Sequence, residues 1–252
     1  MRHLTTTLCL IALLSAVLSR SALSDGQYEP VASSASRYNW TGLYAGAHLG
    51  GTWGTTTAHD LSRYNALGDT WDADTSGFVA GAQAGYNWQW GPIVFGLEGD
   101  IGNLGLSGGG TTTFAPVAFD TSSRTESDFY LTTRGRLGFL VDDWLIYGTG
   151  GYIGADTRVS VIDTCTTSPP CGPSSINASD DSFRSGWTAG GGVEAALGGA
   201  WTAKAEYLYY DLGGESVSGL AAGTGPQFRW NLDTHGNVVR AGVNYKFSGT
   251  GY

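Results

Sequence analysis

Apolar and polar positions alternate along the chain, most clearly in the stretch from His235 to Phe247. Valine, alanine, tyrosine and phenylalanine occupy one face of this stretch, whereas Arg240, Asn244 and Lys246 occupy the other. Because side chains alternate between the two faces of a strand, the pattern predicts a strand between two different environments. Charges on one face are costly in a sandwich core, but they fit the interior of a barrel whose outer face contacts lipid.

Seven further stretches repeat this alternation: 40–53, 78–88, 93–101, 129–139, 144–155, 186–197 and 201–209. Short breaks at 89–92, 142–143 and 198–199 separate pairs of them, and four longer polar stretches are expected to form loops. The first loop follows Trp53, and the second runs from Asn103 to Ser127. The third contains Cys165 and Cys171, and the fourth runs from Leu212 to Thr234. Short turns that alternate with long loops are typical of outer-membrane barrels. The sequence therefore predicts an all-β fold, an eight-stranded antiparallel up-and-down transmembrane β-barrel with both termini in the periplasm.

Aromatic residues gather near both ends of the predicted strands, as in the two interfacial belts of membrane barrels. The belt at the turns would comprise Trp40, Trp88, Trp90, Phe139, Trp144, Trp201, Tyr245 and Phe247. The belt toward the loops would comprise Trp53, Phe78, Phe129, Trp187 and Tyr209. The alternative is a soluble barrel with apolar residues inside and charges outside, which the alternation disfavours.

Four segments follow from composition. Residues 1–24 have a basic start, an apolar run and small residues before Asp25, which predicts a secretory signal peptide. Residues 25–38 are expected to form a periplasmic tether, 39–247 the barrel and 248–252 a tail. Removal of the signal leaves only Cys165 and Cys171, and in an exported protein these are predicted to form a disulfide.

The charged residues bear on the possible partners and on the barrel interior. The chain has 40 glycines, 14% charged residues and a net charge of -9, and this acidity argues against a nucleic-acid partner. No metal site is predicted. By alternation, acids and bases of nearly equal number point into the barrel and are predicted to form a plugging network: Glu98, Asp100, Arg134, Arg136, Glu194, Lys204, Glu206, Arg240 and Lys246.

Several motifs together resemble one family: 39–51, the Gly81 to Trp88 block, Arg134-Gly135-Arg136-Leu137-Gly138, 147–151 and 239–247. They are similar to the small outer-membrane β-barrel family of alphaproteobacteria, the Omp25/Omp31-type surface antigens. The resemblance implies an abundant eight-stranded outer-membrane barrel with structural and antigenic roles, and haemin-binding or porin-like roles in some members. It also implies a terminal signal that the barrel-assembly machinery reads. The candidate residues are Val243, Tyr245 and Phe247, but here the chain continues to Tyr252, so the signal is either internal at Phe247 or shifted to Tyr252.

Three function classes remain open: a structural and surface-interaction barrel, a narrow porin, and a haemin receptor. The first leads, because an eight-stranded barrel is filled by its own side chains, and Tyr44 is among the bulky inward residues. The candidate haemin ligands are His59, Tyr64 and His235, and no other cofactor is expected. The chain is not expected to be an enzyme. Its expected partners are outer-membrane lipid, lipopolysaccharide, the barrel-assembly machinery and host or surface ligands.

Overall fold

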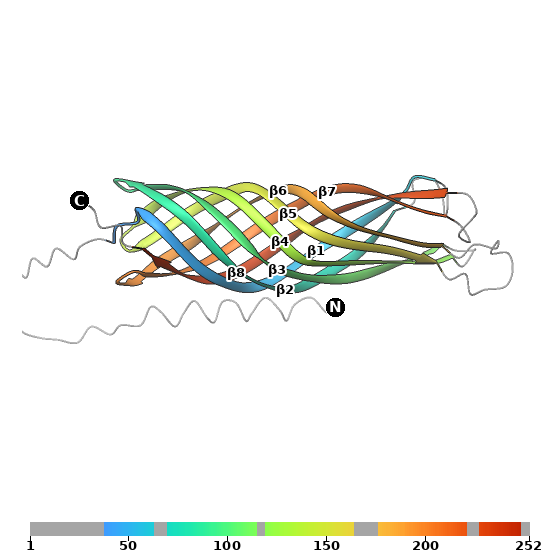
Figure 1. Cartoon of the computed structure of the whole chain (residues 1–252), viewed down its shortest axis with the longest axis horizontal. Helices are drawn as coiled ribbons and strands as arrows, with labels where there is room; N and C mark the ends of the chain where they lie inside the picture. The colour runs from blue at the N-terminus through green and yellow to red at the C-terminus, as the bar shows by residue number, and fades with distance from the viewer. Residues whose placement is uncertain (1–37, 63–69, 115–118, 164–175, 221–226, 248–252) are drawn as a thin grey trace, which may run out of the picture. The chain divides into compact units, whose positions relative to one another are not determined.

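The computed structural model contains eight β-strands (Figure 1). It describes residues 38–62, 70–114, 119–163, 176–220 and 227–247. The strands are β1 Gly42–Asp60, β2 Thr70–Trp90, β3 Ile93–Phe114, β4 Phe119–Val141, β5 Trp144–Asp163, β6 Ile176–Gly198, β7 Trp201–Leu220 and β8 Gln227–Lys246. No helix long and apolar enough to cross a membrane occurs in these ranges.

Each strand pairs antiparallel with its neighbours in sequence, and β8 closes the ring by pairing with β1. Tight turns join β2 to β3, β4 to β5 and β6 to β7, and they need left-handed backbone at Gly91 (φ 60°) and Asp142 (φ 53°). Aspartate tolerates this conformation better than most non-glycine residues. The predicted fold class, an eight-stranded antiparallel β-barrel, is confirmed.

The strands are longer than the sequence pattern predicts, ranging from 19 to 23 residues. The expected loop from Asn103 to Ser127 is wrong, since Ser107 pairs with Glu126 and Thr111 with Ser122 in one continuous hairpin. The loop expected from Leu212 to Thr234 is likewise mostly a hairpin of β7 and β8. Glycine, serine and threonine look like loop residues in sequence, but in this barrel each neighbouring strand supplies their backbone hydrogen bonds.

The outward side chains change from apolar to polar along each strand. On β1 the outward side chains from Leu43 to Trp53 form the apolar part, whereas Thr55, Thr57 and His59 follow beyond it. The apolar part matches the roughly 9–11 residues that a tilted strand needs to cross a bilayer. We call the strand segments beyond the belt of Trp53, Phe78, Phe129, Trp187 and Tyr209 the distal half.

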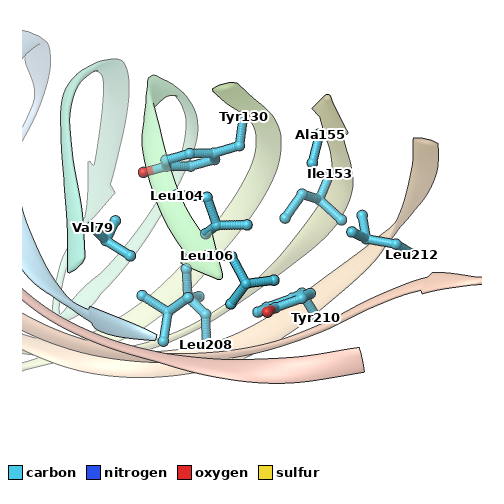
Figure 2. Close-up of a cluster of buried hydrophobic side chains, with 10 residues drawn as sticks. Val79, Leu104, Leu106, Tyr130, Ile153, Ala155, Leu208, Tyr210 and Leu212 are labelled. Carbon is cyan, nitrogen blue, oxygen red and sulfur yellow. The ribbon is translucent and has the colours of Figure 1, made fainter. Parts of the chain in front are cut away.

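The barrel interior contains three apolar layers. The turn-end layer comprises Trp40, Val94, Leu145 and Tyr147. The middle layer comprises Val79, Leu104, Leu106, Tyr130, Ile153, Ala155, Leu208, Tyr210, Leu212 and Val238 (Figure 2). The tip layer comprises Ala58, Trp71, Val159, Val161, Val217, Trp230 and Leu232. Polar side chains occupy the positions between these layers.

Trp40 does not belong to the lipid-facing belt that the sequence predicts. Its side chain is 2% exposed and packs in the turn-end layer, and its backbone N–H donates to Gln89 Oε1 at 2.8 Å. Trp40 precedes β1, so the alternation of that strand does not fix its direction. Residues 38–40 therefore help to close the barrel at its turn end.

Several predictions fall on residues that the structure does not describe. These are the signal peptide 1–24, nearly all of the tether 25–38, the tail 248–252, the disulfide of Cys165 and Cys171, and the Tyr64 and Tyr252 side chains. They stay predictions.

Candidate functional site

A cluster of buried charges occupies the lumen between the turn-end and middle layers. Glu98 and Asp100 come from β3, Arg134 and Arg136 from β4, Glu194 from β6, Lys204 and Glu206 from β7, and Arg240 from β8. Alternate residues of each strand point into the lumen, and these eight side chains are at such positions. Each residue is at most 4% exposed. We call these eight residues the charge cluster.

Strand register places acids opposite bases in the charge cluster. Glu98 is the pairing partner of Arg134, Glu194 of Lys204, and Glu206 of Arg240. Opposite charges at directly facing positions of an antiparallel pair attract each other. With four carboxylates and four cations, the cluster is formally neutral.

Arg134 is the centre of the cluster. Its Nη2 donates to Glu98 Oε1 at 2.6 Å and to Asp100 Oδ2 at 2.7 Å, and its Nη1 donates to Glu206 Oε1 at 3.1 Å. The planar guanidinium can donate hydrogen bonds to several carboxylates at once because it has five N–H donors. Three acids from two non-adjacent strands are thus tied to one side chain across the lumen.

Arg240 joins the same acids from the opposite wall. Its Nε donates to Glu206 Oε2 at 2.7 Å and its Nη2 to Asp100 Oδ1 at 3.2 Å. Beside it, the His48 ring nitrogens lie 2.6 Å from Gln83 Oε1 and 2.6 Å from Tyr130 Oη. His48 is therefore held inside the barrel by its neighbours.

The remaining members extend the cluster toward the turns. Lys204 Nζ donates to Glu98 Oε2 at 2.9 Å, and Arg136 Nη2 donates to Glu194 Oε2 at 2.6 Å. The Arg136 guanidinium carbon also lies 4.1 Å from the centre of the Tyr147 ring, a cation–π contact with the turn-end layer.

Lys246 differs from the rest of the predicted set. It follows the lumen parity of β8 but lies at the barrel rim, where its Nζ donates to the Asn39 carbonyl and lies 4.5 Å from the centre of the Tyr38 ring. Burial, and then the negative charge of Glu194, raise the pKa of Tyr38 to about 12, so this phenol stays protonated. Lys246 therefore holds residues 38–39 at the turn end and makes no contact with the charge cluster among the described residues.

The predicted haemin ligands do not meet in the described part of the chain. His235 pairs with Thr55, and His59 lies four residues further along β1, about 13 Å away at the strand rise. His59 Nε2 lies 3.5 Å from Asp233 Oδ2 on the outer face of the distal half.

The residues predicted as an assembly signal lie at the end of β8. Val243 and Tyr245 point outward and are 46% and 40% exposed, and the Phe247 N–H donates to the Leu43 carbonyl at 2.9 Å. They border the closing β1–β8 pair.

Three polar residues of the lumen lie outside the predicted charge network but donate hydrogen bonds to it or to each other. Asn244 Nδ2 donates to Glu194 Oε1 at 2.8 Å, Gln83 Nε2 donates to Asn244 Oδ1 at 2.6 Å, and the Tyr44 hydroxyl donates to Glu98 Oε2 at 2.8 Å. The sequence alternation already predicts that all three side chains point inward. Their hydrogen-bond partners lie across the lumen, however, and parity does not reveal those.

The closed ring, the outward apolar band and the charged lumen define the class of outer-membrane β-barrel proteins. The family model for the outer membrane protein beta-barrel domain matches residues 10–247, and the chain belongs to this family.

Named relatives agree with this class. The chain is 32% identical to the 31 kDa outer-membrane immunogenic protein of Brucella melitensis, over 86% of this chain and 88% of the relative. It is 30% identical to the 25 kDa outer-membrane immunogenic protein of Brucella abortus, over 84% and 82%. Among solved structures it is similar to the outer membrane protein OprG from Pseudomonas aeruginosa, with 12% identity, a TM-score of 0.49 and coverage of 83% and 97%.

Proposed function

We propose that this outer-membrane protein is a non-conducting surface barrel with a structural and antigenic role. One observation carries the proposal: the lumen is filled in succession by the turn-end layer, the charge cluster and the middle layer. Along β3, Val94, then Glu98 and Asp100, then Leu104 point inward in this order. An eight-stranded barrel has an interior that side chains can fill, so such a succession closes it.

The orientation is part of the proposal. The tight turns and both termini face the periplasm, and the distal half with its hairpin tips faces the outside, as in related membrane barrels with short turns and long outer loops. The outer face of the distal half carries polar and acidic residues, including Asp72, Asp74 and Asp181, which suit contact with water and lipopolysaccharide. The related immunogenic proteins of Brucella support a role as a surface antigen.

Planar-bilayer recording tests the closed lumen. We expect the folded protein to produce no discrete conductance steps, because both apolar layers and the charge cluster would have to open together. Heat-modifiable gel mobility of the same sample verifies that the inserted protein is a folded barrel. Discrete, reproducible steps from this sample would contradict the proposal and favour a narrow porin.

A further inference from the structure

The barrel wall is not continuous in the distal half, because β6 and β7 separate there. Their backbone pairing runs from the turn at Gly198 and Trp201 to Trp187 and Asp211, and no pair joins the described segments 176–186 and 212–220 beyond that point. The other sides of both strands stay paired, β6 with β5 up to Ile176 and β7 with β8 up to Leu220. Figure 1 shows the strand tips at the right dividing into an upper and a lower group. We call the facing unpaired segments 179–186 and 212–220 the seam; at its start the backbone of Gly186 still lies against Asp211 and Leu212.

Each side of the seam is a strand edge. In a strand that is paired on one side only, every second residue turns its N–H and C=O away from the ladder, and these groups can pair with another extended chain. Neither edge contains proline, which would remove a donor. The edges begin where β7 bulges between Asp211 and Gly214, with Gly213 in a left-handed conformation (φ 68°).

Side chains, rather than backbone, connect the two edges. Glu215 Oε2 on β7 lies 2.8 Å from Arg184 Nε and accepts a hydrogen bond of 2.7 Å from Ser182 Oγ, both on β6. These contacts hold the edges near each other without using backbone donors or acceptors. A chain that enters the seam therefore has the backbone groups of both edges available to it.

Unsatisfied polar atoms lie in the interior of the distal half, and one of them is on the seam itself. Arg184 is 4% exposed, and its Nη2 has no hydrogen-bond partner among the described residues. The same holds for four buried hydroxyls that lie between the middle and tip layers or beside them: Thr75 Oγ1, Thr125 Oγ1, Ser127 Oγ and Thr157 Oγ1. Because a buried polar atom without a partner costs free energy, an inward side chain of an inserted strand that carries an acceptor oxygen would be stabilised beside Arg184 Nη2.

The charge of the seam indicates what kind of chain fits it. Residues 179–186 and 212–220 contain three acids, Asp180, Asp181 and Glu215, and one base, Arg184, and Asp181 also pairs with Arg158 on β5 at 2.7 Å. The outward side of β6 also presents Phe183, which is 52% exposed. We propose that the seam is a docking site for an extended, cationic polypeptide segment, which adds as a strand between β6 and β7.

Hydrogen exchange on the refolded barrel in detergent micelles tests whether the edges are free. Every second amide in 179–186 and 212–220, those not bonded to β5 or β8, is expected to exchange faster than the amides in 157–161, where β5 is paired on both sides. Protection of the seam amides equal to that of 157–161 would overturn the proposal. Protection that grows with protein concentration would indicate pairing between copies of the chain and would overturn it as well.

The docking step is tested with a defined probe, an acetylated and amidated ten-residue peptide that alternates lysine with valine and threonine. It should slow exchange at the seam amides. A control peptide with the same side chains but N-methyl groups on alternate residues should bind at least about tenfold more weakly, because several backbone donors are lost. Equal binding of the two peptides, or binding without protection of the seam, would overturn strand addition.

Charge reversal separates the seam from the rest of the acidic surface. Asp181→Lys lies on β6 at the seam and should weaken binding of the lysine peptide several-fold. Asp74→Lys, on the outer face of β2, is the matched control and should leave binding unchanged. An equal effect of both substitutions would mean that the peptide is attracted by overall charge only, which contradicts a docking site at the seam.

Discussion

Arg134→Ala is expected to lower the free energy of unfolding of the barrel by about 3–5 kcal/mol, the usual cost of breaking a buried ion pair. Arg134 has no exposed side-chain surface and donates to Glu98, Asp100 and Glu206. Its removal leaves the four acids of the cluster with only three cations, so one negative charge in the lumen loses its counter-charge. Denaturant unfolding in detergent micelles, followed by tryptophan fluorescence, measures the loss.

Two further variants make this result specific. Arg124→Ala removes an arginine whose side chain is 67% exposed and paired with Glu126, and it should leave stability nearly unchanged, as for other surface pairs. Adding Glu98→Gln to Arg134→Ala restores neutrality and should recover part of the lost stability. If Arg134→Ala cost no more than Arg124→Ala, the charge cluster would not stabilise the barrel.

Sequence alone predicts the membrane half of the barrel well, because alternation has a strict period there. From Phe95 to Ile101 on β3 and from Val239 to Tyr245 on β8, outward positions are apolar or glycine and inward positions are glycine or polar. The inward direction of Glu98, Arg134 and Arg240 follows from this parity. Their facing positions follow from register, which the tight turns fix.

The distal half could not be predicted in the same way, for two physical reasons. Register shifts between Ser127 and Tyr130 and between Asp211 and Gly214 interrupt the alternation, because an extra residue in one strand exchanges its two faces. The buried positions change from odd to even residue numbers on β4 and from even to odd residue numbers on β7. In addition, several inward positions there hold large apolar residues, such as Trp71 and Trp230, whereas the middle of the membrane half holds the charge cluster. Along one strand, large apolar residues therefore face outward in the membrane half and inward in the distal half.

The ends of the barrel also depend on contacts that a local pattern does not contain. Trp40 turns into the lumen because the turn-end layer and Gln89 bind it there. Lys246 contacts residues 38–39, more than two hundred positions away in the chain, although its parity is that of the charge cluster. Such long-range contacts appear only once the ring is closed.

Val243→Arg is expected to destabilise the folded barrel in lipid by about 2–4 kcal/mol, the cost of an arginine near the midplane on the lipid face. Val243 is 46% exposed and lies midway along the apolar face of β8, paired with Ala47 on β1 and Ala203 on β7. None of these neighbours can neutralise or solvate a guanidinium. Reversible unfolding in lipid vesicles measures the difference from the wild-type chain.

The depth dependence of this cost identifies the membrane-embedded part of the barrel. Ser160→Arg introduces the same side chain on the outer face of β5 in the distal half, where the neighbouring strands carry Arg124 and Ser179 at the paired positions. Because water rather than lipid surrounds that segment in the proposed orientation, Ser160→Arg should change stability little. A cost at Ser160 equal to that at Val243 would place the distal half in lipid as well, and the division of each strand at Trp53, Phe78 and Phe129 would then be wrong.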